Sequence, residues 1–166
     1  VPDSDQHITV VLEIIHNGER KIAASTSGHG IYILNADSHE IDHDTQNVIN
    51  RMLPSKFVSG MFKDSRNRLW TATDDGGISV MDLGTMTEHE DIWSSGMSKE
   101  TSDIINSFIE DSVTGNIYLG TANSGILVWD AETGRIRRTK ENTRTGFSIM
   151  SMLKNNIVTR YGDNTY

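Results

Sequence analysis

A short pattern recurs three times along this chain at a nearly constant interval. Each copy begins with a threonine and ends five residues later with Gly-Ile, and the copies are residues 26–31, 73–78 and 121–126. The three threonines are 47 and 48 residues apart, and an apolar residue stands four positions before each of them. Because the threonine, the Gly-Ile pair and the preceding apolar residue all recur with the same period, the chain is built from repeated structural units of about 47 residues.

Each unit predicts four short β-strands. Apolar and β-branched residues alternate with polar ones in short runs, and clusters of Gly, Asn, Asp and Ser separate the runs. In the second unit the expected strands are residues 58–63, 69–73, 78–82 and 86–89. In the third they are residues 105–110, 116–121 and 125–130, followed by a turn at 130–134 and an outer strand around residues 135–138. In the first they are residues 9–15, 20–26, 30–35 and 39–44.

Four antiparallel strands in a period of about 45 residues are typical of a β-propeller blade. We therefore predict an all-β fold, a β-propeller segment of about 3.5 four-stranded antiparallel blades. The blade-like repeats cover about residues 8–50, 57–93 and 104–140, with an incomplete repeat at 147–166. We expect the pairs Val80-Met81 and Val128-Trp129 to fill the space between neighbouring sheets.

Closed propellers have four to eight blades, so a segment of this size leaves two apolar sheet faces uncovered. Either the chain is a piece of a larger propeller or a second copy completes it. We expect the first, with the remaining blades of the parent chain as partners, and keep a homodimer as the alternative.

Charge and composition exclude several classes of partner. Asp and Glu outnumber Lys and Arg by 23 to 15, which argues against nucleic acid as a ligand. The chain has no cysteine, so disulfides, thiolate metal sites and cysteine nucleophiles are excluded. No apolar run approaches the roughly 18 residues that span a bilayer, so we expect no direct membrane insertion by this segment.

The repeats resemble the two-component regulator propeller repeat. The third unit matches best, with Ile-Glu-Asp-Ser at residues 109–112, Gly-Asn-Ile-Tyr-Leu-Gly-Thr at 115–121 and Gly-Ile at 125–126. The second unit follows with Asp-Ser-Arg-Asn at 64–67 and Leu-Trp at 69–70. The first departs most, because it has Asn-Gly in place of the Asp-Ser turn and no aromatic residue at the Trp position.

This resemblance implies a sensor. Propellers of that family usually form the periplasmic part of hybrid two-component receptors, which respond to oligosaccharides. They are followed by a β-sandwich, a membrane helix and a histidine kinase, none of which lies in these 166 residues. The resemblance thus implies a periplasmic ectodomain of an inner-membrane receptor, with an oligosaccharide or other small ligand and the parent's signalling domains as partners.

Candidate ligand residues lie in turns and in the loops between blades, which share one face of a propeller. His29 stands between two glycines in the turn from the second to the third strand, and Asp74, Asp75 and Asn123 lie in the equivalent turns. Trp93 follows the second blade beside a polar run, and a sugar site combines an apolar ring face with polar groups. Basic residues that could contact an acidic sugar lie in the loops at residues 47–56, 93–103 and 140–146, namely Arg51, Lys56, Lys99 and Arg144.

The sequence predicts neither a metal site nor a cofactor. His39 and His43 are the densest pair of metal-ligand candidates, but we place both on an outer strand. Residues four apart on a strand are about 13 Å apart and cannot share one ion. Solvated polar residues at a sheet edge are the simpler interpretation.

Catalysis has little support in the sequence. No nucleophile-elbow pattern is present, and Asp74 and Asp75 are adjacent, so their side chains point apart. We therefore expect no enzyme activity in this segment. Two alternatives stay open: a propeller lyase similar to the streptogramin lyases, with His and Glu at the central channel, and a protein-binding scaffold propeller.

Overall fold

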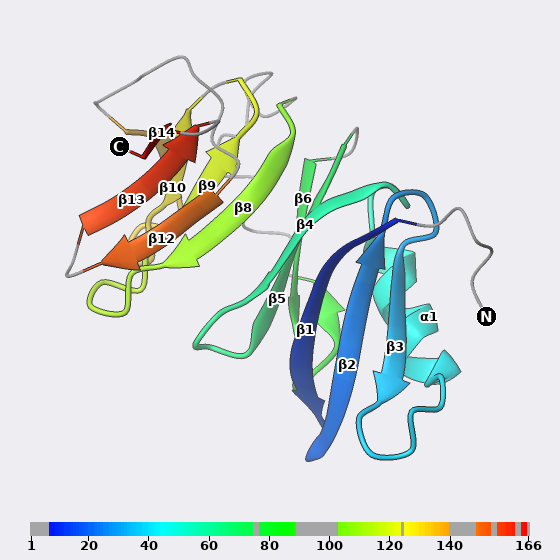
Figure 1. Cartoon of the computed structure of the whole chain (residues 1–166). Coiled ribbons are helices and arrows are strands. Elements are labelled where there is room, and N and C mark those ends of the chain that lie inside the picture. The colour runs from blue at the N-terminus through cyan, green and yellow to red at the C-terminus, as the bar shows by residue number, and fades with distance from the viewer. Residues whose placement is uncertain are drawn as a thin grey trace. The chain divides into compact units, whose positions relative to one another are not determined.

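The computed structural model describes residues 7–74, 77–88, 103–123 and 125–139, together with the backbone of three further strands between residues 149 and 165. The chain divides into two compact units, Val1–His89 and Glu90–Tyr166. Each unit contains two antiparallel sheets, in which strands adjacent in sequence are also adjacent in the sheet (Figure 1). The all-β prediction is confirmed, apart from one short helix.

The first unit holds a three-stranded and a four-stranded sheet. The first sheet contains β1 (Ile8–His16), β2 (Glu19–Thr26) and β3 (Ile31–Asn35). The second sheet contains β4 (Val58–Lys63), β5 (Arg68–Thr73), β6 (Gly77–Asp82) and β7 (Thr87–Glu88). The four strands predicted for the second repeat are therefore all present, although the outermost one is short.

The second unit repeats this arrangement. Its first sheet contains β8 (Ile105–Glu110), β9 (Ile117–Thr121), β10 (Ile126–Trp129) and β11 (Ile136–Arg138). Its second sheet contains β12 (Ile149–Leu153), β13 (Asn156–Tyr161) and β14 (Asn164–Thr165). The incomplete repeat that we predicted at residues 147–166 thus contains three strands, of which the last is short.

The recurring Thr and Gly have a shared structural role in all three repeats. The hydroxyl of each repeat threonine donates a hydrogen bond across the following turn to the carbonyl of the repeat glycine. The three bonds join Thr26 to Gly30, Thr73 to Gly77 and Thr121 to Gly125, at 2.9, 3.4 and 2.8 Å. Each glycine has a positive φ, a backbone conformation that glycine adopts without strain. The sequence period therefore marks one hairpin closure per repeat.

The segment after β3 corrects one prediction. We predicted an outer strand at residues 39–44 and a loop at 47–56, whereas the helix α1 (His43–Met52) takes in the end of the first segment and most of the second. Asp42 caps this helix by accepting a hydrogen bond from the Thr45 amide at 3.0 Å. An isolated bridge between Leu34 and Ile41 is all that remains of the expected strand pairing.

The helix satisfies the free edge of β3 with side chains in place of a strand. The Asn50 amide accepts a hydrogen bond from the Ile31 N–H at 3.0 Å and donates one to the Ile31 carbonyl at 2.7 Å. One turn earlier, Gln46 accepts a hydrogen bond from the Ile33 N–H at 3.2 Å. Residues four apart lie on one face of a helix, which is why both amides reach the same strand.

The core of the first unit lies between its two sheets and α1. Side chains from alternate positions of the first sheet pack against the second sheet, and Ile49 joins them from the helix. The buried members are Ile14, Ala23, Ile31, Ile33, Ile49, Val58, Met61, Leu69, Met81 and Leu83. The predicted interior positions Val80, Met81, Val128 and Trp129 are all buried.

Among the residues that the structure describes, no helix is both long and apolar enough to cross a membrane.

Candidate functional site

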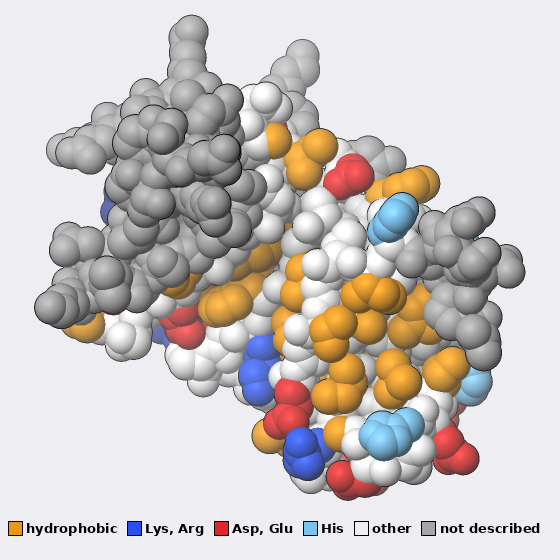
Figure 2. Space-filling model, viewed as in Figure 1, with side chains coloured by type: hydrophobic (Ala, Val, Ile, Leu, Met, Phe, Trp, Pro, Cys, Tyr) orange, Lys and Arg blue, Asp and Glu red, His pale blue; other side chains and the backbone are white. Residues whose placement is uncertain are grey.

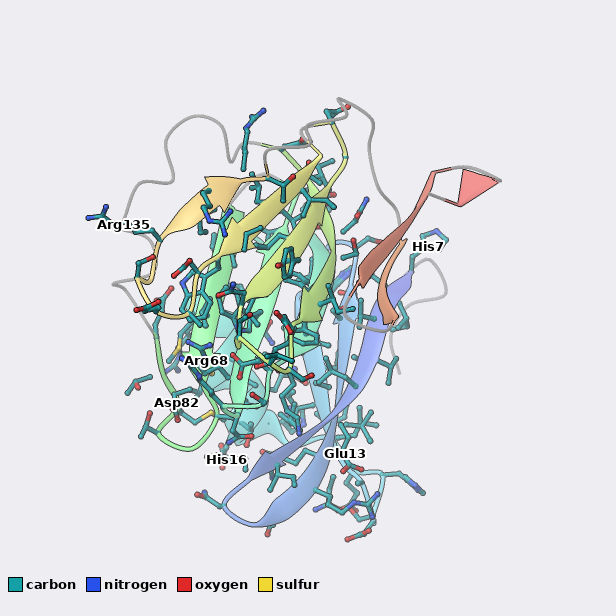
Figure 3. All side chains as sticks on the ribbon, turned by 90° about the vertical axis from the view of Figure 1, so that its left-hand side faces the viewer. His7, Glu13, His16, Arg68, Asp82 and Arg135 are labelled. Carbon is teal, nitrogen blue, oxygen red and sulfur yellow. The ribbon has the colours of Figure 1, made fainter. Side chains whose placement is uncertain are left out.

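The β2–β3 turn, the start of β4 and the β5–β6 turn lie together at one end of the first unit. The Gly28 and Gly30 amides both donate hydrogen bonds to the Lys56 carbonyl, at 3.1 and 2.9 Å. The Asp74 amide donates one to the Phe57 carbonyl at 3.0 Å. His7 lies near this end of β1 and His16 lies at the other (Figure 3). We call the group of His29, Phe57 and Asp74 the turn-end site.

Phe57 places an aromatic ring at the centre of the turn-end site. The residue is 51% exposed, which is unusual for a large apolar residue. A bridge pairs its backbone with Ser27, and a Cβ atom added to Gly28 would lie 3.5 Å from the ring carbon Cε1. The glycine therefore leaves the backbone of the turn lying directly against the ring, and part of the ring faces solvent.

His29 and Asp74 provide polar groups on the segments that flank Phe57. Both residues are exposed, and neither side chain forms a hydrogen bond or ion pair with another residue that the structure describes. The His29 amide donates a hydrogen bond to the Thr26 hydroxyl at 3.0 Å, which fixes the backbone of the turn and leaves the imidazole available. The turn-end site thus combines one apolar ring with an imidazole and a carboxylate.

Lys56 adjoins the turn-end site through its backbone carbonyl, but its ammonium donates a hydrogen bond to the Asn50 carbonyl. The remaining predicted ligand residues are not brought into this site. Arg51 is exposed in the last turn of α1, whereas we had placed it in a loop. Asn123 belongs to the second unit, where its side-chain amide donates a hydrogen bond to Asp103 at 2.9 Å. The other four predicted residues, Trp93, Asp75, Lys99 and Arg144, lie outside the described residues.

Sequence reasoning missed Phe57, although a signal for it exists. The residue that follows each repeat threonine donates its amide hydrogen to the carbonyl of a residue just before or at the start of a first strand. The acceptors are His7, Phe57 and Ile104, at 3.1, 3.0 and 2.8 Å. All three acceptor side chains are exposed. Comparing the repeats at this position locates Phe57 as the aromatic residue of the set, whereas its exposure follows from the folded structure.

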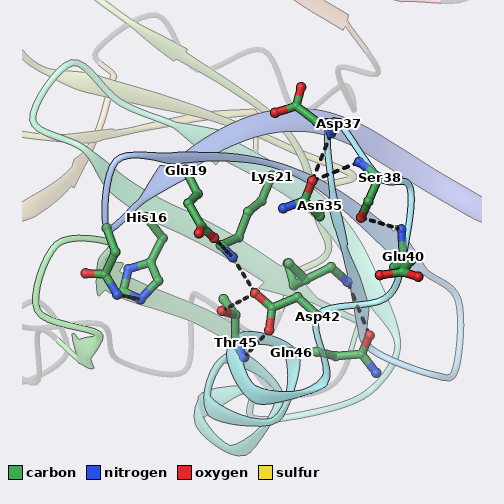
Figure 4. A network of polar contacts seen from close by, with 12 residues as sticks. His16, Glu19, Lys21, Asn35, Asp37, Ser38, Glu40, Asp42, Thr45 and Gln46 are labelled. Carbon is green, nitrogen blue, oxygen red and sulfur yellow. Dashed lines mark hydrogen bonds and ion pairs between the residues drawn. The ribbon is translucent and has the colours of Figure 1, made fainter.

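The opposite end of the first unit holds a polar network around a buried lysine (Figure 4). The Lys21 side chain is only 6% exposed, and its ammonium donates hydrogen bonds to Asp42 at 2.5 Å and to Glu19 at 3.0 Å. Arg68 stands 47 positions later in the second repeat and is buried beside Asp64. The first repeat lacks the Asp-Ser turn, and the cap of α1 supplies the carboxylate instead.

An open hollow of about 340 Å³ lies beside this network and is lined by His16, Lys21, Asp44 and Met86, among others. The His16 ring contacts the Leu83 carbonyl through Nδ1 at 2.8 Å and the Asn17 amide through Nε2 at 3.0 Å. Since that amide nitrogen can only donate, Nδ1 carries the ring hydrogen. Lys21, Asp42 and His16 thus already have protein partners, which favours the turn-end site as the place for a ligand.

The Lys21–Asp42 pair should make the stability of the first unit depend on pH in acid. Burial raises the pKa of the Asp42 carboxyl, but hydrogen bonds from Lys21 and Thr45 outweigh burial and bring that pKa down to about 2. An unfolded Asp titrates near pH 3.9, so the stabilisation is complete above about pH 5 and is lost as the pH falls through 2. The shift corresponds to about 2 kcal/mol of unfolding free energy.

Urea unfolding of the wild type and of Asp42→Asn between pH 7 and pH 2 checks this prediction. Asn preserves the helix cap but carries no charge. The stability advantage of the wild type should shrink by about 2 kcal/mol on going from pH 5 to pH 2. A constant difference between the two proteins over this range would contradict the assigned ion pair.

His39 and His43 do not lie on one outer strand, contrary to our prediction. His39 lies in a turn with a φ of 61°, and His43 is the first residue of α1, so the expected outer strand that separated them does not exist. Within the described part of the chain, no group of three or more His, Asp or Glu side chains is arranged to hold a metal ion.

Solved structures with a similar fold include extracellular domains of bacterial signalling proteins. The extracellular domain of the proposed hybrid two-component system BT3049 from B. thetaiotaomicron matches 92% of this chain, with a TM-score of 0.68 and 18% identity. That of BT4673 from the same organism, proposed to be a one-component system, matches 92% with a TM-score of 0.63 and 15% identity. The chain spans 19% and 22% of those domains, about a fifth of their length.

The computationally designed protein Ika4 matches the whole chain over 94% of its own length, with a TM-score of 0.64 and 17% identity. No family model matches the sequence. At these identities the comparisons show the fold, and the resemblance of the sequence to a sensor repeat agrees with it.

Proposed function

We propose that this chain is a ligand-recognition segment of an extracellular sensor propeller in a two-component signalling receptor, and that the ligand is an oligosaccharide. Two independent lines support the sensor role: the repeat pattern of the sequence and the fold shared with extracellular domains of such receptors. We further propose that the parent receptor is periplasmic, that it carries a histidine kinase, and that this segment binds its ligand without catalysis.

The observation that carries the ligand class is the exposed Phe57 ring between two polar residues. A pyranose has an apolar C–H face and an edge of hydroxyl groups, so it suits an aromatic ring flanked by hydrogen-bonding side chains. The Asp74 carboxylate accepts hydrogen bonds from hydroxyls, and a neutral His29 both donates and accepts. Phe57 supplies the stacking surface in this arrangement, and the two polar side chains set the orientation of the ring.

Screening the full chain on an oligosaccharide array, followed by calorimetry with the strongest binder, tests this proposal. Replacement of Phe57 by Ala should weaken binding about tenfold or more, because a central aromatic contact typically contributes more than about 1 kcal/mol. Phe57→Tyr keeps the ring and should bind nearly as well as the wild type. Val113→Ala removes a 76% exposed apolar side chain elsewhere and serves as the surface control.

Two results would overturn the proposal. One is the absence of binding to every oligosaccharide on the array at millimolar concentration. The other is an affinity that Phe57→Ala leaves unchanged, which would place the ligand away from the turn-end site.

A further inference from the structure

Lys56 brings a positive charge to the turn-end site. A Cβ atom added to Gly28 would lie 3.5 Å from the Phe57 ring, and one added to Gly30 would lie 3.1 Å from the Lys56 Cδ atom. The aromatic ring and the lysine stem therefore lie against the two glycines that flank His29. Lys56 thus belongs to the same turn end as the ring and the imidazole.

The charge of Lys56 is not used in an ion pair within the described part of the chain. Figure 2 shows one face of the molecule, on which the Lys and Arg groups in view over the first unit lie beside Asp and Glu groups. No ion pair joins Lys56 to any residue that the structure describes. Three other basic residues of the first unit do have carboxylate partners: Arg20 with Glu13, Lys21 with Asp42 and Arg68 with Asp64.

The Lys56 ammonium has more hydrogen-bonding capacity than its contact with α1 requires. It donates one hydrogen bond to the Asn50 carbonyl, near the end of that helix, and an ammonium carries three N–H groups. The residue is exposed, so a ligand can approach it, and partial burial lowers the pKa of its ammonium. A bound anion stabilises a partly desolvated cation of this kind, because it supplies the opposite charge.

Asp74 gives the turn-end site a second, negative end. The segment that contains Lys56 and Phe57 runs between two turns. On one side the Gly28 and Gly30 amides donate hydrogen bonds to the Lys56 carbonyl, and on the other side the Asp74 amide donates one to the Phe57 carbonyl. An anionic group on a ligand is attracted to the side of Lys56 and repelled from the side of Asp74, which fixes the direction in which the ligand lies.

We propose that the turn-end site takes an acidic oligosaccharide, and that Lys56 binds a carboxylate or sulfate group of the sugar. An oligosaccharide extends over several rings, so one ring can stack on Phe57 while the charge of the same or the next ring meets Lys56. The resulting hydrogen bond between an ammonium and an anionic oxygen is of the strong, charge-assisted type. This inference rests on the proposed function, since it names the class of oligosaccharide for the same site.

Calorimetry of the whole chain with two matched pairs of oligomers tests the inference. One pair is oligogalacturonate and its methyl ester, and the other is a galactose oligomer with and without sulfate groups. The wild type should bind the charged member of at least one pair about tenfold more tightly than the uncharged member. The two pairs distinguish a carboxylate from a sulfate as the source of the charge.

Lys56→Gln should remove this preference and leave the affinity for the uncharged member unchanged. Glutamine has an amide that can still donate a hydrogen bond to the Asn50 carbonyl, but it carries no charge. The control is Arg135→Gln, which removes the same charge from an exposed position of the second unit and should keep the preference. Phe57→Ala should weaken both members of a pair alike, because it removes the stacking surface and not the charge.

Labelling of the lysine amines with trinitrobenzenesulfonate, followed by mass mapping, locates the contact directly. The charged oligomer that binds should slow the labelling of Lys56, whereas its uncharged partner should not. Lys63, which is partly buried elsewhere in the first unit, should react at the same rate throughout.

The inference is wrong if both members of each pair bind equally or not at all, or if the preference for charge survives in Lys56→Gln. Unprotected labelling of Lys56 in the presence of a bound acidic oligomer also contradicts it. Binding of a neutral oligosaccharide that Phe57→Ala weakens would leave the proposed function intact in each of these cases, so the two proposals can fail separately.

Discussion

Replacement of Asp64 by Ala should destabilise the first unit by about 3–5 kcal/mol, a large part of the total stability of a domain. Asp64 is 3% exposed, and its carboxylate accepts four hydrogen bonds. Two come from the backbone amides of Arg66 and Arg68, one from the Arg68 guanidinium at 2.6 Å and one from the Trp70 indole at 2.8 Å. Without the carboxylate, the buried guanidinium loses the charge of Asp64 beside it, and the indole N–H loses its hydrogen bond to Asp64.

The third repeat offers a matched control for this effect. Asp111 stands 47 residues after Asp64, at the same place in its turn. It is only partly buried and accepts hydrogen bonds from the Val113 amide at 3.0 Å and the Thr114 hydroxyl at 2.6 Å. Asp111→Ala should therefore lower the free energy of unfolding by only about 1 kcal/mol, as expected for the loss of hydrogen bonds in an exposed turn.

Urea unfolding followed by circular dichroism separates the two cases. Asp64→Asn keeps an acceptor oxygen but not the charge, so its stability should lie between those of the wild type and Asp64→Ala. Equal losses for Asp64→Ala and Asp111→Ala would show that the buried ion pair adds nothing beyond the turn.

Replacement of Gly30 by Ala should cost about 3 kcal/mol, because it strains the backbone and disrupts the attachment of α1 to β3. The φ of Gly30 is +78°, which residues with a side chain rarely adopt. A Cβ atom there would lie 2.1 Å from the side-chain oxygen of Asn50, which accepts a hydrogen bond from the Ile31 amide. Asn50 would have to move, and both of its hydrogen bonds to Ile31 would break.

The strain and the collision can be measured separately with Gly18. Gly18 has the same φ of +78°, but a Cβ atom added there meets nothing within 4 Å. Gly18→Ala should therefore lower the free energy of unfolding by only about 1 kcal/mol, which is the strain of a residue with a side chain at positive φ. Thermal unfolding of both variants gives the difference, and a Gly30→Ala variant no less stable than Gly18→Ala would contradict the role assigned to Asn50.

The strands were predictable because the same strand pattern recurs in three repeats of the sequence. Thr26, Thr73 and Thr121 recur with their glycines at one period, so the repeats support one another even where a single copy is ambiguous. The helix was not predicted because, within the described part of the chain, it occurs in one repeat only. Its signals were nevertheless local: Asp42 as a cap, ten residues without Gly or Pro, and Pro54 shortly after the end. These helix signals were overlooked because we expected the first repeat to have the same four strands as the others.

The candidate site was predictable only in part. His29 and Asp74, which we predicted from their turns, lie on segments that flank Phe57, and their role in ligand binding stays a prediction. The contribution of Phe57 depends on its exposure, and a lone Phe before a strand is ordinarily buried in the core. Exposure follows from the way that Gly28 and Asp74 pair with the chain on either side of the ring, and that pairing is a property of the folded protein.

The side-chain attachment of α1 also bears on how such repeats can diverge. Asn50 and Gln46, together with the short backbone bridge at Ile41, complete the hydrogen bonding of β3 without a fourth strand, while the apolar positions between the sheets stay occupied. The outermost position of a repeat is thus a replaceable module, in which a helix can stand in for a strand as long as two amides reach the edge. Lineages of this architecture can therefore vary their periphery by exchanging whole secondary-structure elements, without redesigning the packing on which the stack depends.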